Sequence, residues 1–278
     1  MRWQRSRRST NVADYRGRRM GGAKIGIGGA LAALVLSYCL GIDPRLMLGL
    51  VESVPTGASP PATTGVPQDE QGQFMSAVLG ETEDVWDAIF REHGAQYTPA
   101  QLVLFTDYAS SACGSASAAV GPFYCPGDQR IYIDLSFYEQ LAAQLDAPGD
   151  FAQAYVLAHE AGHHVQNLMG IASQVRAAQQ RASQVEANQL QVRMELQADC
   201  FAGLWAHHAH EREAYLEEGD IEEGLRAASA VGDDLLQKRA QGYVVPESFT
   251  HGTAEQRASW FRRGLETGSL EACDTFAD

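Results

Sequence analysis

The chain has little positive charge outside its first 24 residues. Over all 278 residues, 35 Asp and Glu outnumber 21 Lys and Arg, which gives a formal net charge of -14. Residues 1–24 hold eight of the basic residues and a single acid, Asp14, so this segment carries +7 and the rest of the chain carries -21. A body this acidic repels a phosphate backbone, and we therefore expect no nucleic-acid partner.

Charge is absent altogether from residues 25–41, IGIGGALAALVLSYCLG. Seventeen residues are near the lower limit for a membrane-spanning helix, roughly 17–25 residues. Because basic residues precede this run and acidic residues follow it, the pattern predicts one transmembrane anchor, with residues 1–24 in the cytoplasm and the body outside. A buried core helix is disfavoured by the Arg-rich flank, and a cleaved signal peptide by the lack of an A-x-A site.

Cysteine is also scarce, and no two of the five cysteines have the C-x-x-C spacing of a zinc knuckle. Cys39 lies within the predicted anchor. Four cysteines remain for an exported domain, where they are expected to form disulfides. Cys113 and Cys125 bracket a loop of small residues, so we predict that they pair with each other and that Cys200 pairs with Cys273. Free buried thiols are the alternative.

The proline content is concentrated before the body of the chain. Residues 53–68, SVPTGASPPATTGVPQ, hold four of the ten prolines and no charge. This composition predicts an extended linker over residues 42–70, and the ordered domain would then comprise residues 71–278.

Residues 71–278 combine helical and strand patterns. Apolar residues at helical spacing predict two helices, FMSAVLG and EDVWDAIFREHG, each ending at a glycine. Three short runs are typical of strands: QLVLFTDY, FYC and RIYIDLS. Further helices are expected over residues 150–169, about 173–186, about 190–210, 220–240 and 254–266, with Asp150 as the cap of the first. These elements predict an α+β fold in which a helical bundle lies beside a small antiparallel sheet.

The first of these later helices contains the sequence HEAGH. His159 and His163 lie four residues apart, so both rings project from one face of the helix, about 6 Å apart. This spacing lets two imidazoles occupy two corners of a zinc tetrahedron. Glu160 lies one residue round the helix, where it can reach a water molecule without sharing the metal, as a general base must.

A catalytic zinc ion needs a third protein ligand. The pattern H-E-x-x-H-x-x-G-x-x-H is excluded, because the sixth residue after His163 is Met169. A later helical sequence, RMELQADCFAGLWA, offers Glu195 and Asp199 four residues apart on one face. Small residues in both helices would let them approach closely enough for Glu195 to bind the metal. Asp199 would then accept a hydrogen bond from the other ring nitrogen of a ligand histidine.

Other histidines are less specific. His251 lies directly before the last predicted helix, in SFTHGT, and would stabilise the oxyanion formed during peptide hydrolysis; a hydrogen bond within its loop is the alternative. His164 is expected to be structural or exposed. The three histidines of AHHAHE, residues 206–211, would be solvated or placed favourably near a helix C-terminus, with a second metal site as the alternative.

Several motifs together resemble one protein family over nearly the whole chain. HEAGHHVQ, ELQADCFAG and SFTHGT, behind a start at MRW and together with VGPFYCPGDQRIYIDLSF, are similar to the bacterial "putative neutral zinc metallopeptidase" family. The resemblance implies a zincin-like domain with zinc bound by His159, His163 and Glu195. By analogy with zincins, the strand Ile131–Leu135 would pair with the substrate backbone.

These patterns predict a membrane-anchored zinc endopeptidase of the bacterial cytoplasmic membrane, with peptides or proteins as substrates outside the cytoplasm. Zinc would polarise the scissile carbonyl and acidify a water molecule, and Glu160 would carry the proton of this water to the leaving amine. The alternative is a non-catalytic, zinc-stabilised envelope scaffold. A purely structural site does not require Glu160, and its presence favours the enzyme.

Overall fold

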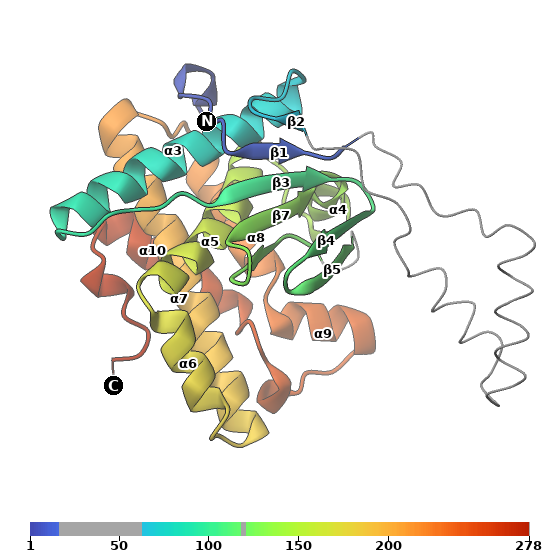
Figure 1. The fold of residues 1–278 in the computed structure, drawn as a ribbon. Helices are drawn as coiled ribbons and strands as arrows, with labels where there is room; N and C mark the ends of the chain where they lie inside the picture. Colours follow the sequence, from blue (N-terminus) through green and yellow to red (C-terminus); the bar gives the residue numbers. More distant parts are fainter. Residues whose placement is uncertain (17–62, 118–120, 278) are drawn as a thin grey trace, which may run out of the picture. The chain divides into compact units, whose positions relative to one another are not determined.

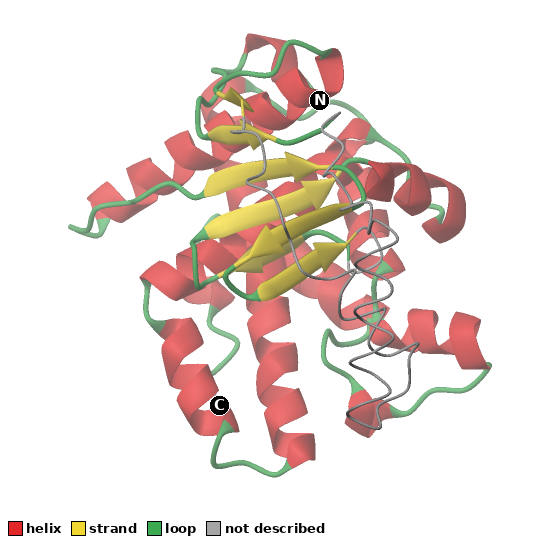
Figure 2. Ribbon diagram, turned by 45° about the vertical axis from the view of Figure 1, so that its right-hand side comes forward, coloured by secondary structure: helices red, strands yellow, loops and turns green. Residues whose placement is uncertain are grey.

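A computed structural model describes residues 1–16, 63–117 and 121–277 (Figure 1). Within these residues a five-stranded sheet has the order β2-β1-β3-β7-β6, and β4 and β5 form a separate antiparallel pair. The strands are β1 (Val12–Asp14), β2 (Thr63–Thr64), β3 (Gln101–Phe105), β4 (Tyr108–Ser111), β5 (Gly114–Ser117), β6 (Phe123–Cys125) and β7 (Arg130–Asp134). Figure 2 shows the strands lying together among the helices.

The sheet is mixed, and the prediction of an antiparallel sheet is wrong. Strands β1, β3 and β7 are parallel, whereas β6 runs antiparallel to β7. Parallel neighbours need a long connection, and the chain between β3 and β7 supplies it by forming the β4–β5 pair and β6 on the way. Consecutive side chains of both central strands are buried, among them Leu102, Val103, Ile131 and Tyr132, so both faces of the sheet are covered.

Eight α-helices are described: α3 (Glu70–Glu92), α4 (Ser136–Leu145), α5 (Asp150–Leu168), α6 (Ile171–Gln179), α7 (Gln184–Glu213), α8 (Asp220–Ala230), α9 (Asp233–Gln241) and α10 (Ala254–Thr267). Short 3-10 turns occur at Trp3–Arg5, Pro246–Ser248 and Glu271–Cys273. The predictions for α5 and α10 are correct to within one residue at each end. The helix predicted over 220–240 is two helices, because the chain bends at Gly232, whose Cα packs against the backbone of Ala254.

The N-terminal part of the body differs most from expectation. The two short helices expected after residue 71 are one helix, α3, which passes through Gly80 without ending. A Cβ atom at Gly80 would lie only 2.4 Å from the carbonyl oxygen of Arg7, so the glycine lets the N-terminal chain approach the helix. In Figure 1 this chain leads into β1, beside α3.

Residues 1–14 belong to the same compact unit as the chain from Thr64 onward. The prediction of a separate basic segment is therefore wrong for these residues, because β1 pairs with β3 and buries Val12 and Ala13. The predicted anchor, residues 25–41, and most of the predicted linker, residues 42–62, lie outside the described residues. Among the residues that are described, no helix is long and apolar enough to cross a membrane.

Candidate metal centre

Helix α5 presents the two histidines of HEAGH on one face, as their spacing predicts. The rings of His159 and His163 have centroids 4.8 Å apart and are nearly perpendicular, at 86°. His159 is buried with 7% of its surface exposed, and His163 is partly buried. Two imidazoles in this arrangement direct their nitrogens to a common point beside the helix.

Glu195 of α7 reaches the same point. Its Oε2 lies 3.2 Å from Nε2 of His159 and 3.5 Å from Nε2 of His163. A tetrahedral zinc ion with bonds of about 2.0–2.2 Å holds its ligand atoms roughly 3.3–3.6 Å apart. The two separations from Glu195 are close to those of a zinc site, and all three donor atoms lie within 4.8 Å of one another. A set of two histidines and one carboxylate leaves a fourth position open, as in catalytic zinc sites.

Close packing of α5 on α7 makes this convergence possible. A Cβ atom at Gly162 would lie 3.1 Å from the carbonyl oxygen of Ala198, so the glycine sits directly against the α7 backbone. This contact agrees with the expected role of small residues in both helices. Gly203 of α7 packs against α10 instead, where a Cβ atom would collide with the carbonyl oxygen of Phe261.

The second nitrogen of each histidine ring has its own acceptor. Nδ1 of His159 lies 2.8 Å from Oδ1 of Asp199, as predicted. Nδ1 of His163 lies 2.9 Å from Oε1 of Gln166, whose amide nitrogen donates to the carbonyl oxygen of Met194 and to Gln197. Both acceptors hold a proton on Nδ1, so Nε2 is the nitrogen of each histidine that can bind a metal. Gln166 was not identified from the sequence, although its position three residues after His163 makes the contact possible.

Asp199 is held by a second partner that the sequence did not indicate. Arg257 of α10 donates from Nε to Oδ2 of Asp199 at 2.8 Å and from Nη2 to Oδ1 at 2.9 Å. The hydroxyl of Tyr155 also donates to Asp199. Arg257 is 3% exposed, so it forms a buried ion pair. The α10 sequence has three arginines, and nothing in the local pattern distinguishes the buried one from Arg262 and Arg263.

The pKa values of Glu195 and His159 depend on the charged groups around them. Burial alone would raise the pKa of the Glu195 carboxyl, but the positive charge of His163 and hydrogen bonds from both histidines hold this pKa well below its usual range. Burial opposes the charged form of His159, yet Asp199 and Glu195 raise the pKa of its ring to about 9. The ring of His159 thus lies between two buried carboxylates, Glu195 and Asp199, of which Asp199 is also paired with Arg257.

Zinc binding is expected to release protons and to strengthen as the pH rises. A zinc ligand must be a neutral imidazole, so below pH about 9 zinc displaces the proton of His159. The affinity should rise with pH up to that value and then level off. Calorimetric zinc titrations at pH 7 in two buffers of different ionisation enthalpy measure the protons released. His251→Ala, outside the ligand set, should release the same number; absence of release in the unsubstituted protein would contradict the assignment of His159.

Glu160 and the three candidate ligands line one cavity of about 510 Å³. Glu160 is 7% exposed. The cavity wall also contains apolar side chains from α4, α6 and α9, among them Phe137, Val175 and Leu236. A carboxylate beside the metal ligands in a cavity of this size can contact a bound substrate or water molecule.

His251 lies in the wall of the same cavity, half exposed. Asp233, the first residue of α9, fixes its loop: Oδ2 accepts from the backbone nitrogens of Thr250 and His251 at 2.7 and 2.6 Å, and Oδ1 lies 3.2 Å from Nδ1 of His251. Burial of Asp233 acts in the opposite direction, but these hydrogen bonds lower the pKa of its carboxyl. The loop bond that was the alternative for His251 is thus present, and Nε2 is the ring nitrogen left to face a ligand.

The remaining histidines do not join the candidate metal centre. His164 is fully buried, with Nδ1 3.0 Å from the Tyr124 hydroxyl and Nε2 2.6 Å from the Thr98 carbonyl oxygen, and its burial lowers its pKa. In AHHAHE, His207 and His208 contact the carbonyl oxygens of Leu265 and Gly268, and His210 accepts from the nitrogen of Leu216. These contacts fasten the ends of α7 and α10.

Strand β6, rather than β7, forms the sheet edge beside the cavity. β7, which contains the predicted substrate-pairing residues Ile131–Leu135, lies between β3 and β6 and is paired on both sides, so this prediction is wrong. Phe123 and Tyr124 of β6 line the cavity. The Tyr124 hydroxyl contacts His164 and accepts from Asn167 at 3.1 Å, which fixes β6 to α5.

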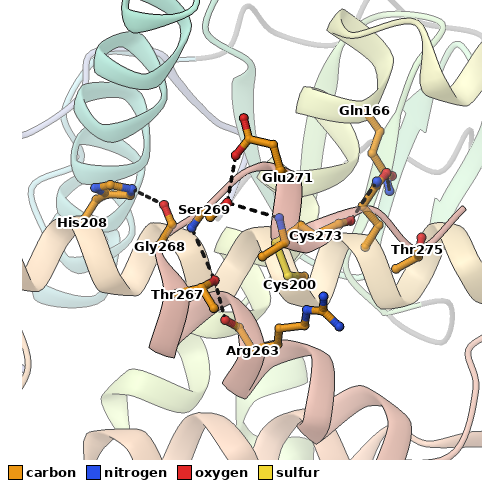
Figure 3. The surroundings of a disulfide bond; sticks show 12 residues. Gln166, Cys200, His208, Arg263, Thr267, Gly268, Ser269, Glu271, Cys273 and Thr275 are labelled. Atoms are coloured by element: carbon orange, nitrogen blue, oxygen red, sulfur yellow. Dashed lines mark hydrogen bonds between the residues drawn. A yellow bond between two sulfur atoms is a disulfide. The ribbon is translucent and has the colours of Figure 1, made fainter. Parts of the chain in front are cut away.

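Both predicted disulfides are present in the structure. Cys113–Cys125 joins the β4–β5 region to β6, and Cys200–Cys273 joins α7 to the C-terminal segment. Figure 3 shows the second bond, near Gln166, with His208 contacting Gly268. The Cys273 carbonyl oxygen accepts from Gln197, which also contacts Gln166. The bond thus connects the C-terminus to the residues that orient His163.

Removing the two disulfides should have different effects. The bonds span 73 and 12 residues, so loop entropy predicts stability losses of about 4 kcal/mol for Cys200→Ala/Cys273→Ala and about 3 kcal/mol for Cys113→Ala/Cys125→Ala. The first pair of substitutions should also weaken zinc binding, because Cys200 follows Asp199. Urea unfolding and zinc competition with a chelator measure both quantities. Unchanged zinc affinity in the first variant would show that the bond does not support the metal centre.

The site is a candidate zinc centre of the HExxH class. It consists of two histidines from the HExxH helix and a glutamate from a later helix, which converge beside a cavity. A family model described as "Putative neutral zinc metallopeptidase" matches residues 1–276, and the chain belongs to this family.

Its relatives are uncharacterised. The chain is 47% identical over 287 residues to "Uncharacterized protein YpfJ" of Escherichia coli strain K12, with 99% of each chain covered. It is 41% identical over 218 residues to "Uncharacterized protein Rv2575" of Mycobacterium tuberculosis strain H37Rv, with 75% of this chain and 73% of the relative covered. No solved structure matches the chain.

Proposed function

We propose that this protein is a zinc-dependent endopeptidase. The observation that carries the proposal is the convergence of His159, His163 and Glu195 next to Glu160 in one cavity. The three ligands fit zinc, and the adjacent carboxylate is the group that a hydrolase needs and a structural zinc site does not. Membership of a family described as a zinc metallopeptidase supports the same reaction class.

When bound, zinc would act as a Lewis acid toward the scissile carbonyl and increase the acidity of a water molecule. The protein supplies the remaining steps. Glu160 accepts a proton from the attacking water and delivers it to the nitrogen of the leaving amine. Asp199 and Gln166 keep the two imidazoles in the required tautomer and orientation.

His251 is the proposed donor to the oxyanion. Asp233 fixes its loop and occupies its Nδ1. Nε2 is then the ring atom available to hydrogen-bond an oxygen that becomes negative as the water attacks. His251 lines the same cavity as Glu160, from a different element, which agrees with a role at the opposite side of the substrate.

The substrate backbone is proposed to pair with β6. This strand is an edge strand next to the cavity, and an edge offers unpaired N–H and C=O groups to an extended peptide. The apolar side chains Phe137, Val175 and Leu236 would receive substrate side chains. An extended substrate bound across an open cavity favours cleavage within a chain over removal of terminal residues.

We further propose that the reaction takes place outside the cytoplasm. Two disulfides in a body of this size are typical of exported bacterial proteins. Residues 25–41 remain the proposed membrane-associated segment, on the basis of their composition.

The test is zinc-dependent cleavage of an unfolded protein such as casein by the purified full-length chain. Cleavage that is abolished by a chelator and restored by zinc is expected. A protein that binds zinc tightly but cleaves no unfolded substrate would instead be the zinc-stabilised scaffold.

A further inference from the structure

The N-terminal ammonium group of Met1 lies in a pocket of three carboxylates. Its nitrogen is 3.2 Å from both oxygens of Asp150, 3.3 Å from Oε2 of Glu217 and 3.4 Å from Oδ1 of Asp220. The Met1 side chain is fully buried in the core, and the Asp220 side chain is 5% exposed. The next residue continues the contact, because Arg2 donates its backbone nitrogen to the carbonyl oxygen of Tyr215 at 2.9 Å.

The pocket matches the chemistry of a free amino terminus. An ammonium has three N–H donors and one positive charge, and each of the three carboxylates accepts from it. Asp150, Asp220 and Glu223 bring carboxylate oxygens within 4.8 Å of one another, so like charges repel unless a cation lies between them. The chain's own first residue supplies that cation. Asp150, predicted as a helix cap, is the first residue of α5 and makes this ion pair instead.

The residues after Met1 form hydrogen bonds with α3 at several positions. Ser9 and Ser76 of α3 exchange hydrogen bonds: the Ser9 nitrogen donates to the Ser76 carbonyl oxygen at 2.9 Å, and the Ser76 hydroxyl donates to the Ser9 carbonyl oxygen at 2.7 Å. Glu83 accepts from Ser9 and Asn11 at 2.6 and 2.8 Å. Gly80 lacks the side chain that would collide with the backbone of Arg7.

We propose that residues 1–14 are an integral part of the body and share one compartment with the metal centre, with the amino group of Met1 held by Asp150, Glu217 and Asp220 and with β1 paired to β3. The ammonium neutralises the acidic start of α5, the helix that carries His159 and His163.

The pairing of β1 with β3 restricts how the proposed membrane-associated segment can be arranged. β1 ends at Asp14 and the chain returns at β2, which starts at Thr63 and lies beside β1 in the sheet. A single membrane crossing between these strands would place β1 and β3 on opposite sides of a hydrocarbon layer about 30 Å thick. Paired strands cannot be separated in this way. The orientation predicted from charge puts residues 1–24 inside and the body outside, and we propose instead that residues 1–14 lie on the same side as the body.

Amine labelling of the folded full-length protein tests the pocket. With a limiting amount of an amine-reactive reagent, we expect Met1 in the folded protein to label about tenfold more slowly than Met1 in denatured protein. A tenfold ratio corresponds to a free-energy cost of about 1.4 kcal/mol for exposing the amino group. Exposed Lys238 is the internal reference. Asp220→Asn should remove the protection of Met1, whereas Glu222→Gln, an exposed charge on the same helix, should not. Full labelling of Met1 in the folded wild-type protein would overturn the site.

A cross-link tests the topology in cells. Ser9→Cys/Ser76→Cys places thiols at two fully buried, hydrogen-bonded positions. Non-reducing peptide mapping should join the N-terminal peptide to the α3 peptide both in purified oxidised protein and in protein taken directly from cells, whereas Ser76→Cys alone should give no such link. A link that forms after purification but not in cells, in protein whose Cys200–Cys273 bond is already formed in those cells, would overturn the shared compartment, and no link in either sample would overturn the packing of residues 1–14. Neither readout depends on peptidase activity.

Discussion

Glu160→Gln is expected to lower peptide hydrolysis by about 10²- to 10⁴-fold, the usual contribution of a general base, while zinc and fold are retained. The amide has nearly the shape of the carboxylate but cannot accept the proton of the attacking water or pass it to the leaving amine. Glu160 lies beside the candidate ligands but is not among the three convergent donors, so its replacement should leave the metal affinity unchanged.

The comparison needs measurements of zinc content and unfolding as well as rate. Glu255→Gln makes the same chemical change at an exposed position of α10 and should retain wild-type activity. A Glu160→Gln protein that is folded, contains zinc and cleaves at nearly the wild-type rate would rule out the general-base role. Loss of zinc in this variant would indicate that Glu160 contributes to metal binding.

Features encoded by short spacings could be read from the sequence. The i, i+4 spacing within a helix places His159 over His163 and Glu195 over Asp199, whatever the rest of the fold does. The pairing of Cys113 with Cys125 follows from their nearness in the chain, and the other pair is what remains. Once the two helices pack through Gly162, the ligand set follows from residues already identified.

Features that depend on contacts between distant segments could not be read in this way. Arg257 lies 58 residues from Asp199, and its sequence neighbourhood is that of an ordinary exposed arginine. β1 contains only Val12, Ala13 and Asp14, too few residues for an alternating pattern, and it follows a run of arginines that is typical of a membrane flank. Strand direction is equally hidden, because alternation predicts a strand but not the partner beside which it lies.

The ligand role of Glu195 and the orienting role of Asp199 should be separable by metal affinity. Glu195→Ala removes one of three donor atoms, and two histidines alone do not hold zinc at ordinary buffer concentrations. Asp199→Ala keeps the three donors but frees the ring of His159, a change that typically costs about 10–100-fold in affinity or activity. Added zinc should therefore restore activity substantially to the Asp199 variant and poorly to the Glu195 variant.

Removal of Asp199 also leaves Arg257 without its partner, and a second substitution at Arg257 provides the control for this effect. Without Asp199 the guanidinium remains buried with its charge uncompensated, which typically destabilises a protein by about 3–5 kcal/mol. Asp199→Ala/Arg257→Met removes both charges and should recover stability but not zinc affinity, because His159 still lacks its acceptor. Zinc occupancy and activity measured against free zinc, together with urea unfolding, distinguish these effects. Equal and full occupancy in the Glu195 and Asp199 variants would mean that neither residue completes the site and that the third ligand lies elsewhere.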